Sequence, residues 1–215
     1  MDTSVSGVGV LDKSVRVLEA LEGGPLGLAE LVEATGLSRA TAHRLAVALE
    51  THGLVRRGDD GRFALGLRLV ALGRGASDAL PLAEAARPAL TALRDETGES
   101  VQLYVRHGDQ RVCVASLESP HGLRTIVGLG ATLPLDRGSA GRALTGASGP
   151  QGWVESVGER EEGVASVSAP VLDEGGGVLA AVSVSGPIPR ISRTPGRLYG
   201  DAVVRAATAV AAAQR

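Results

Sequence analysis

One stretch of the chain constrains its fold more than any other. The apolar residues of this stretch follow the i, i+3, i+4 and i+7 spacing of a helix with one buried face, at Ala42, Leu45, Ala46 and Leu49. Ser38 lies just before them, and its hydroxyl can accept a hydrogen bond from the free amides of a first helical turn. The sequence therefore predicts an amphipathic helix from about Arg39 to His52, capped by Ser38 and ended by Gly53.

The residues on either side of this helix complete a small domain. Leu11–Leu21 and Leu28–Ala34 have the helical period and are followed by glycine or proline, so two short helices are expected before it. Leu54–Arg57 and Arg62–Leu65 are expected to be strands joined by a tight turn of Asp and Gly. Three helices followed by a β-hairpin are typical of a winged helix-turn-helix domain, which we assign to residues 1–66.

The polar face of the third helix and the hairpin carry side chains suited to DNA. An arginine fork can bind guanine or phosphate in the major groove, and hairpin arginines can enter a narrow minor groove. The alternative is a solvated basic face on an ordinary three-helix domain. The predicted DNA contacts are Ser38, Arg39, Thr41, His43, Arg44, Arg56, Arg57 and Arg62.

The charge along the chain agrees with a local DNA-binding surface. The net charge is only −2, and residues 1–35 are acidic. Residues 36–75 reverse this, with seven arginines against three acidic residues. A basic surface restricted to one part of the chain is typical of a regulator rather than of a protein that coats DNA.

The rest of the chain has a different pattern. Residues 67–80 are predicted to form a linker helix, and 81–215 an α+β domain with a mainly antiparallel sheet. Its first helix, Leu82–Thr97, contains Pro88, which can divide or kink it. The other expected elements are strands at Val101–Val105, Arg111–Ser116, Arg124–Gly130, Val164–Val171 and Val178–Ser185, and a closing helix at Gly196–Ala213.

Hydroxyl side chains cluster in the last two of these strands. Residues two apart share a face of a strand, so Ser166 lies beside Ser168, and Ser183 beside Ser185. In a hairpin the four serines would line one concave face, near the amides of the segment 138–141 that opens the next helix. Such a face suits a small polar or anionic ligand. The alternative is a row of serines on a solvent-facing strand surface.

Signals of other function classes are missing. The single Cys113 excludes a disulfide framework and a multi-cysteine metal site, and its apolar strand favours a place in the core over a nucleophilic role. The four histidines lack metal-ligand spacing, and nucleotide-binding and nucleophile-elbow motifs are absent. We therefore expect no enzyme activity, cofactor or metal. Without an apolar run of about 20 residues or a signal peptide, the expected location is the cytoplasm, away from membranes.

Motifs in both halves resemble one family. The first half matches in Leu37–Leu45 and in Arg62–Gly66, and the second half in Gly138–Ala143, Ser168–Val171 and Ala181–Pro187. Together they resemble the isocitrate-lyase-regulator (IclR) family of transcription factors over nearly the whole chain. The segments 7–13 and 158–171 are similar to short actinomycete members of the NdgR type, which are linked to leucine and other amino-acid biosynthesis.

The resemblance implies a winged-helix domain, a linker helix and a GAF-like effector-binding domain in a homodimer or tetramer. Such a protein binds operator DNA, and a small metabolite switches its repression or activation. The alternative is a ligand-sensing signalling module with vestigial DNA binding. Where relatives place a pocket cysteine this chain has Ser166, and where some place an aspartate it has Ser156. The implied effector contacts are Ser139, Ala140, Ser166, Ser183 and Ser185.

One departure from the family stands out. Relatives usually have a helical insertion between the segments that correspond to 138–146 and 153–163, and here only Ala147–Gly152 connects them. Either the insertion is missing from the protein, or the sequence skips a segment at this point. A missing insertion would leave the effector pocket more open on one side.

Overall fold

The computed structural model describes residues 6–78 and 80–214. Residues 1–5, at the start of the expected DNA-binding domain, Ala79 in the expected linker, and Arg215 lie outside the described residues. The chain divides into two compact units, residues 1–79 and 80–215, and each is described by itself. None of the described helices combines the length and apolar character that crossing a bilayer requires.

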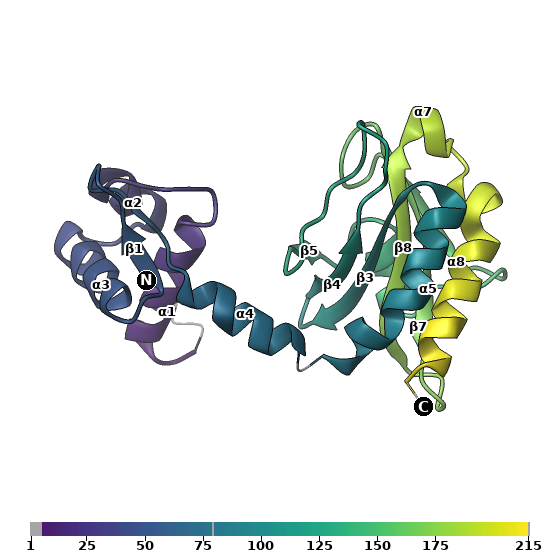
Figure 1. Ribbon diagram of the computed structural model, residues 1–215, viewed down its shortest axis with the longest axis horizontal. Coiled ribbons are helices and arrows are strands. Elements are labelled where there is room, and N and C mark those ends of the chain that lie inside the picture. The colour runs from purple at the N-terminus through teal and green to yellow at the C-terminus, as the bar shows by residue number, and fades with distance from the viewer. Residues whose placement is uncertain (1–5, 79, 215) are drawn as a thin grey trace. The chain divides into compact units, whose positions relative to one another are not determined.

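The first unit contains the predicted helices and hairpin. Its elements are α1 (Gly9–Ala20), α2 (Leu28–Thr35), α3 (Arg39–Thr51), β1 (Val55–Arg57), β2 (Phe63–Leu65) and α4 (Arg68–Asp78). Figure 1 shows the hairpin beside the three helices. β1 and β2 pair antiparallel, and Leu26 forms an isolated bridge to Phe63. These contacts hold the hairpin against the segment that precedes α2.

Local signals fix the ends of these helices as expected. Ser38 Oγ accepts from the amide of Thr41, and Gly36 ends α2 in the left-handed conformation that glycine adopts most easily. The stripe of α3 that the spacing predicted is buried, together with Val17, Leu31 and Phe63. Burying one such large apolar side chain stabilises the fold by roughly 1.5–3 kcal/mol, so the sequence pattern and the core agree.

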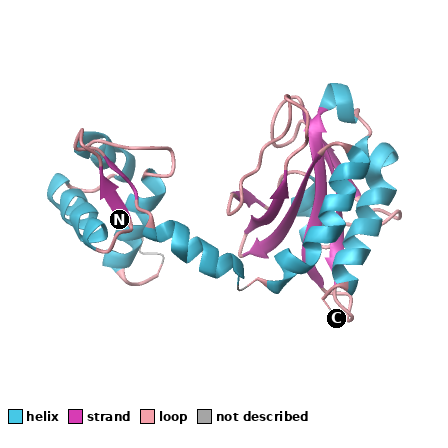
Figure 2. Cartoon of the chain, viewed as in Figure 1, coloured by secondary structure: helices cyan, strands magenta, loops and turns pink. Residues whose placement is uncertain are grey.

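The second unit is an antiparallel sheet with helices on both faces, an α+β fold as predicted. Its strand order is β5-β4-β3-β8-β7-β6. Its elements are α5 (Pro81–Thr97), β3 (Ser100–His107), β4 (Gln110–Leu117), β5 (Thr132–Pro134), α6 (Ser139–Leu144), β6 (Val154–Val157), β7 (Val164–Leu172), β8 (Val178–Pro187), α7 (Ile188–Ile191) and α8 (Pro195–Ala212). Figure 2 shows the long helices along one face of the sheet.

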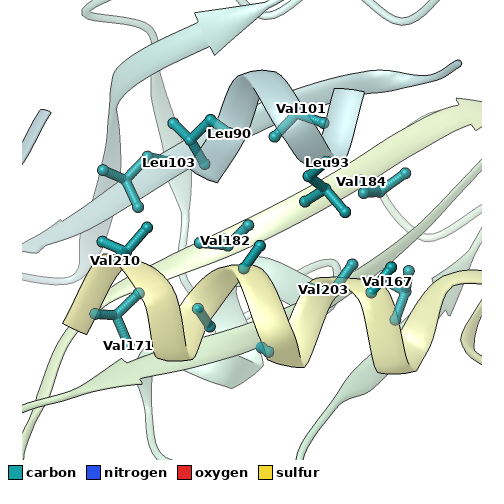
Figure 3. Close-up of a cluster of buried hydrophobic side chains, with 14 of the residues drawn as sticks. Leu90, Leu93, Val101, Leu103, Val167, Val171, Val182, Val184, Val203 and Val210 are labelled. Atoms are coloured by element: carbon teal, nitrogen blue, oxygen red, sulfur yellow. The ribbon is translucent and has the colours of Figure 1, made fainter. Parts of the chain in front are cut away.

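The two faces of the sheet have different cores. α5 and α8 cover one face, where Val182 and Val184 of β8 point into the apolar cluster shown in Figure 3. Ala181 belongs to a smaller cluster with α6 on the other face. Because side chains alternate along a strand, Ser183 and Ser185 lie on the α6 face. The valines of β8 therefore pack as the sequence predicted.

Two predictions about the second unit need correction. Residues 124–130 form no strand. Gly130 has a positive φ of 81° and donates to the carbonyl of Cys113 in β4, and the regular ladder with β4 covers only Thr132–Pro134. Pro88 does not divide α5, which is continuous from Pro81 to Thr97. The sequence reading also missed the strand β6 and the short helix α7.

Residues 145–153 connect α6 to β6. In the connector, the amide of Gly149 donates to the carbonyl of Trp153, and that of Gly152 to the carbonyl of Gly149. Trp153 packs over two glycines of α8, Gly196 and Gly200, where any Cβ atom would overlap its ring. A short connector anchored on α8 therefore stands where the family pattern has a helical insertion.

Candidate functional site

The outward face of α3 is basic. Arg39, His43 and Arg44 are exposed, and none has an ion pair or hydrogen bond among residues 6–78 and 80–214. Ser38 Oγ is 2.9 Å from Thr41 Oγ1 and also caps the helix, so both hydroxyls are partly engaged within the first turn. The face is free to contact a polyanion.

The three hairpin arginines are not equivalent. The Arg57 guanidinium lies 4.5 Å from the centre of the Phe63 ring, and Arg62 donates to the carbonyl of Pro25 and to Glu30, 2.7 Å away. Arg56 is exposed and has no ion pair or hydrogen bond within the described part of the chain. Arg62 therefore holds the hairpin to α2, and Arg56 is the hairpin arginine that no described contact engages.

Glu30 links α2 to the hairpin. Its carboxylate accepts from the amide of Gly27, 2.6 Å away, and from Arg62. The hydrogen bond from Gly27 and that from Arg62 lower the pKa of Glu30 below its usual range. The carboxylate of Glu30 thus joins the start of α2 to Arg62 of the hairpin.

In the second unit the predicted serines lie together, below the surface. Ser139 Oγ is 2.7 Å from the hydroxyls of both Ser166 and Ser168, and Ser168 donates to Ser183 over 2.9 Å. Ser185 donates to the buried Gln102, 3.0 Å away. Ser168 and Ser183 are fully or almost fully buried, so the alternative of a solvent-facing row of serines is wrong.

These serines surround a cavity of about 20 Å³. The five residues expected to contact an effector, Ser139, Ala140, Ser166, Ser183 and Ser185, all line it. Strand register explains their meeting, because Ser166 of β7 pairs with Ser185 of β8 on one side and with Ser156 of β6 on the other. The remaining lining residues are Tyr104, Arg111, Gly138, Ser156, Arg160 and Val164.

The amide of Gly138 is not available to a ligand. It donates to Glu159, 3.1 Å away, and Arg142 also holds this carboxylate at 2.6 Å. The Arg142 hydrogen bond is the main cause that lowers the pKa of Glu159. Of the amides at 138–141 that the sequence suggested for binding, the one of Gly138 is therefore already engaged within the protein.

Sequence reasoning missed Tyr104, Arg111 and Arg160 as lining residues. Arg111 follows the turn between two predicted strands, where a charge usually faces water, yet it is only 2% exposed. Its partners come from the 134–137 segment, so no local pattern could have placed it. Burial raises the pKa of the Tyr104 hydroxyl, which keeps it a hydrogen-bond donor.

Cys113 is part of the core, as its apolar strand predicted. It is fully buried beside α6, and burial raises the pKa of its thiol to about 12. Among residues 6–78 and 80–214, no three potential metal-ligating side chains come together.

The comparisons with known proteins agree with the two-unit division. The IclR helix-turn-helix domain matches residues 10–59. The C-terminal domain of bacterial IclR transcriptional regulators matches residues 75–149 and 147–212, two pieces that meet at the connector between α6 and β6.

Individual relatives extend over most of the chain. The glycerol operon regulatory protein of Streptomyces griseus is 30% identical over 84% of this chain and 85% of its own. The transcriptional repressor IclR of Escherichia coli is 25% identical over 93% of this chain and 88% of its own. These relatives are regulators and not enzymes, in agreement with the absence of enzyme motifs.

Solved structures agree with the fold. An IclR homologue from Microbacterium hydrocarbonoxydans, in complex with 4-hydroxybenzoate, is 22% identical and has a TM-score of 0.79. The match covers 95% of this chain and 98% of that one.

Proposed function

The chain belongs to the IclR family of bacterial transcriptional regulators, and we propose that its first unit reads an operator through α3 while its second unit binds a small polar or anionic effector. The observation that carries the DNA-binding part is the exposed face of α3, where Arg39, His43 and Arg44 have no partner among the described residues. Guanidinium groups on such a helix can form paired hydrogen bonds with guanine in the major groove.

The proposed DNA contacts divide by role. Arg39 and Arg44 contact base edges or phosphates, and Ser38, Thr41 and His43 contact the backbone or neighbouring edges. Arg56 neutralises phosphate or enters the minor groove. Arg57 and Arg62 contribute less to DNA binding, because Arg57 lies over the Phe63 ring and Arg62 pairs with Glu30. Residues 67–80 act as the linker helix, through which the effector unit changes the operator affinity.

We further propose that the protein acts as a homodimer or a tetramer. Leu67, Val70 and Leu72, at the start of α4 and within it, are exposed by 80%, 61% and 54%. Apolar side chains gathered on one short segment favour association with a second copy. A dimer would bind half-sites whose centres lie about one helical turn of DNA apart, roughly 34 Å, or a multiple of it.

The resemblance of segments 7–13 and 158–171 to NdgR-type members supports a role in amino-acid metabolism of the leucine type. Repression is the proposed mode, and activation is the alternative. The genes next to this one are the first targets to examine. Specific binding to DNA upstream of glycerol-metabolism genes would instead favour a role like that in the name of the Streptomyces griseus relative, a glycerol operon regulatory protein.

An electrophoretic shift assay with DNA from upstream of the gene and its neighbours tests the proposal. Arg44→Ala is expected to weaken specific binding by about 1–3 kcal/mol and to relax the base preference at one position of each half-site. Arg197→Ala, which removes an exposed arginine from α8 of the second unit, is the matched control and should leave the affinity unchanged. Unchanged affinity and base preference in Arg44→Ala would contradict the role of α3 in recognising the bases of the operator.

A further inference from the structure

One charged side chain near the serine cavity is buried without an ion pair among the described residues, although Asp136 lies near enough to interact with its charge. Arg111 of β4 is 2% exposed and lines the cavity. A buried guanidinium is costly unless a carboxylate or several acceptors compensate it, because charge is poorly solvated in the protein interior. The same burial lowers the pKa of Arg111 below its ordinary value.

The partners of Arg111 satisfy only part of its guanidinium. Nη1 donates to the backbone carbonyls of Pro134 and Arg137. Nε is buried and has no hydrogen-bond partner, and no carboxylate forms an ion pair with Arg111 among the residues that the structure describes. The Tyr104 ring lies 5.5 Å from the guanidinium carbon. Donor capacity and positive charge are therefore both left over at the cavity wall.

The rest of the lining does not neutralise this charge. A second arginine, Arg160, lines the cavity, and the other lining side chains are hydroxyl, apolar or glycine. The nearby carboxylate of Glu159 does not line the cavity and is bound to Arg142. The cavity therefore combines two positive charges with several serine hydroxyls and no acid.

We propose that Arg111 binds a carboxylate group of the effector, so that this residue, rather than the serines, restricts the effector to carboxylic acids. The inference rests on the proposed function and refines its effector class. A guanidinium and a carboxylate match as two planar groups joined by parallel hydrogen bonds. The volume of about 20 Å³ exceeds the roughly 10–15 Å³ that one water needs, so it suits one compact group of this kind.

The serines have a second role in this arrangement. Ser183 and Ser185 line the same cavity from β8, which β3 separates from the strand that carries Arg111, and hydroxyls can both donate and accept. They can hydrogen-bond the remaining oxygen atoms of a bound acid. Charge selection by Arg111 and hydrogen bonding by the serines are thus separable.

The test compares charged and uncharged probes of nearly the same shape on the full-length protein. Acetate and pyruvate are titrated against acetamide and pyruvamide, with inorganic phosphate as a separate arm, and NMR chemical shifts follow the binding. The carboxylates are expected to bind at least about tenfold more tightly than their amides. Equal binding of the amides, a preference for phosphate, or no saturable binding of any probe would overturn the proposal.

Variants of Arg111 test whether this residue causes the preference for carboxylates. Arg111→Gln should abolish the preference for carboxylates, and Arg111→Lys should keep only part of it, because an ammonium lacks the planar fork. Arg106→Gln is the matched control, since Arg106 is exposed and pairs with Arg111 across β3 and β4. Retained carboxylate binding in Arg111→Gln would contradict the assignment. If that variant fails to fold, the probe pairs on the natural protein still decide.

Failure of this inference differs from failure of the proposed function. Arg111-dependent binding of acetate without any operator binding would support the role of Arg111 and contradict the proposed function as a DNA-binding regulator. An uncharged metabolite that changes operator affinity in the shift assay would support the proposed function and contradict the restriction of the effector to carboxylic acids.

Discussion

In the first unit the candidate functional side chains stand on the exposed face of a helix whose other face forms the core. In the second unit they lie between the sheet and α6, and Ser139, Ser183 and Ser185 are at most 5% exposed. The first arrangement separates function from stability, because exposed side chains away from packing contribute little to folding. The second joins them, since buried polar groups must be hydrogen-bonded to one another until a ligand arrives.

The helix glycines give the largest expected contrast between the units. Gly200 of α8 faces the Trp153 ring, whereas Gly73 of α4 has open space around it. Gly200→Ala should destabilise the second unit by about 3 kcal/mol through overpacking, and Gly73→Ala should stabilise α4 by about 1 kcal/mol. Trp153 is the only tryptophan of the chain, so its fluorescence in a urea titration follows the unfolding of the second unit.

The double variant Gly200→Ala, Trp153→Ala is the control for this mechanism. Removing the ring should cancel most of the strain that the new methyl group causes, as measured by circular dichroism during urea unfolding. Additive losses in the double variant would show that the glycine matters for another reason.

Two serines allow a comparison of intermediate size. Ser168 is fully buried with hydroxyl partners in Ser139 and Ser183, and Ser38 is an exposed helix cap. Ser168→Ala should cost about 2 kcal/mol because it leaves buried hydroxyls without a partner, and Ser38→Ala about 1 kcal/mol. Chemical denaturation of the two variants measures both values. A neutral Ser168→Ala would mean that the serine cluster tolerates an apolar replacement.

The smallest expected effect concerns acid. The pKa values of Glu30, held by Gly27 and Arg62 in the first unit, and of Glu159, held by Arg142 in the second, are lowered below the ordinary 4.5. A lowered folded-state pKa stabilises the fold above the unfolded value, and this contribution disappears as pH falls through the folded value. Glu30→Gln and Glu159→Gln should therefore lower the melting temperature slightly at neutral pH and not at all in strong acid.

Melting curves of the natural protein and both variants between neutral and strongly acidic pH provide the measurement. Both ion pairs are at least a third exposed on each side, so solvent screens them and the shifts should be small. A difference from the natural protein that grows on acidification would have the wrong sign and would contradict this account.

The sequence predicted the first unit better than the second for a physical reason. Helix spacing, the Ser38 cap and the glycine ends act within a few residues, so the pattern around α3 already contains them. In the second unit the sequence predicted which serines share a strand face, because alternation is also local. The predicted strand at 124–130 failed because the chain reaches β4 only at its end, where Gly130 has a positive φ and the ladder follows at Thr132–Pro134.

The sequence by itself determined the helix-turn-helix, the antiparallel hairpin of β7 and β8, and the serines as candidate ligand contacts. Only the tertiary structure decided that Arg62 holds the hairpin, that Trp153 anchors a short connector on α8, and that Arg111 lies at the serine cavity. Each of these depends on residues far apart in the chain, such as Arg111 with Pro134 and Arg137, or Arg62 with Glu30. Such contacts follow from strand register and packing, which no short-range pattern in the sequence encodes.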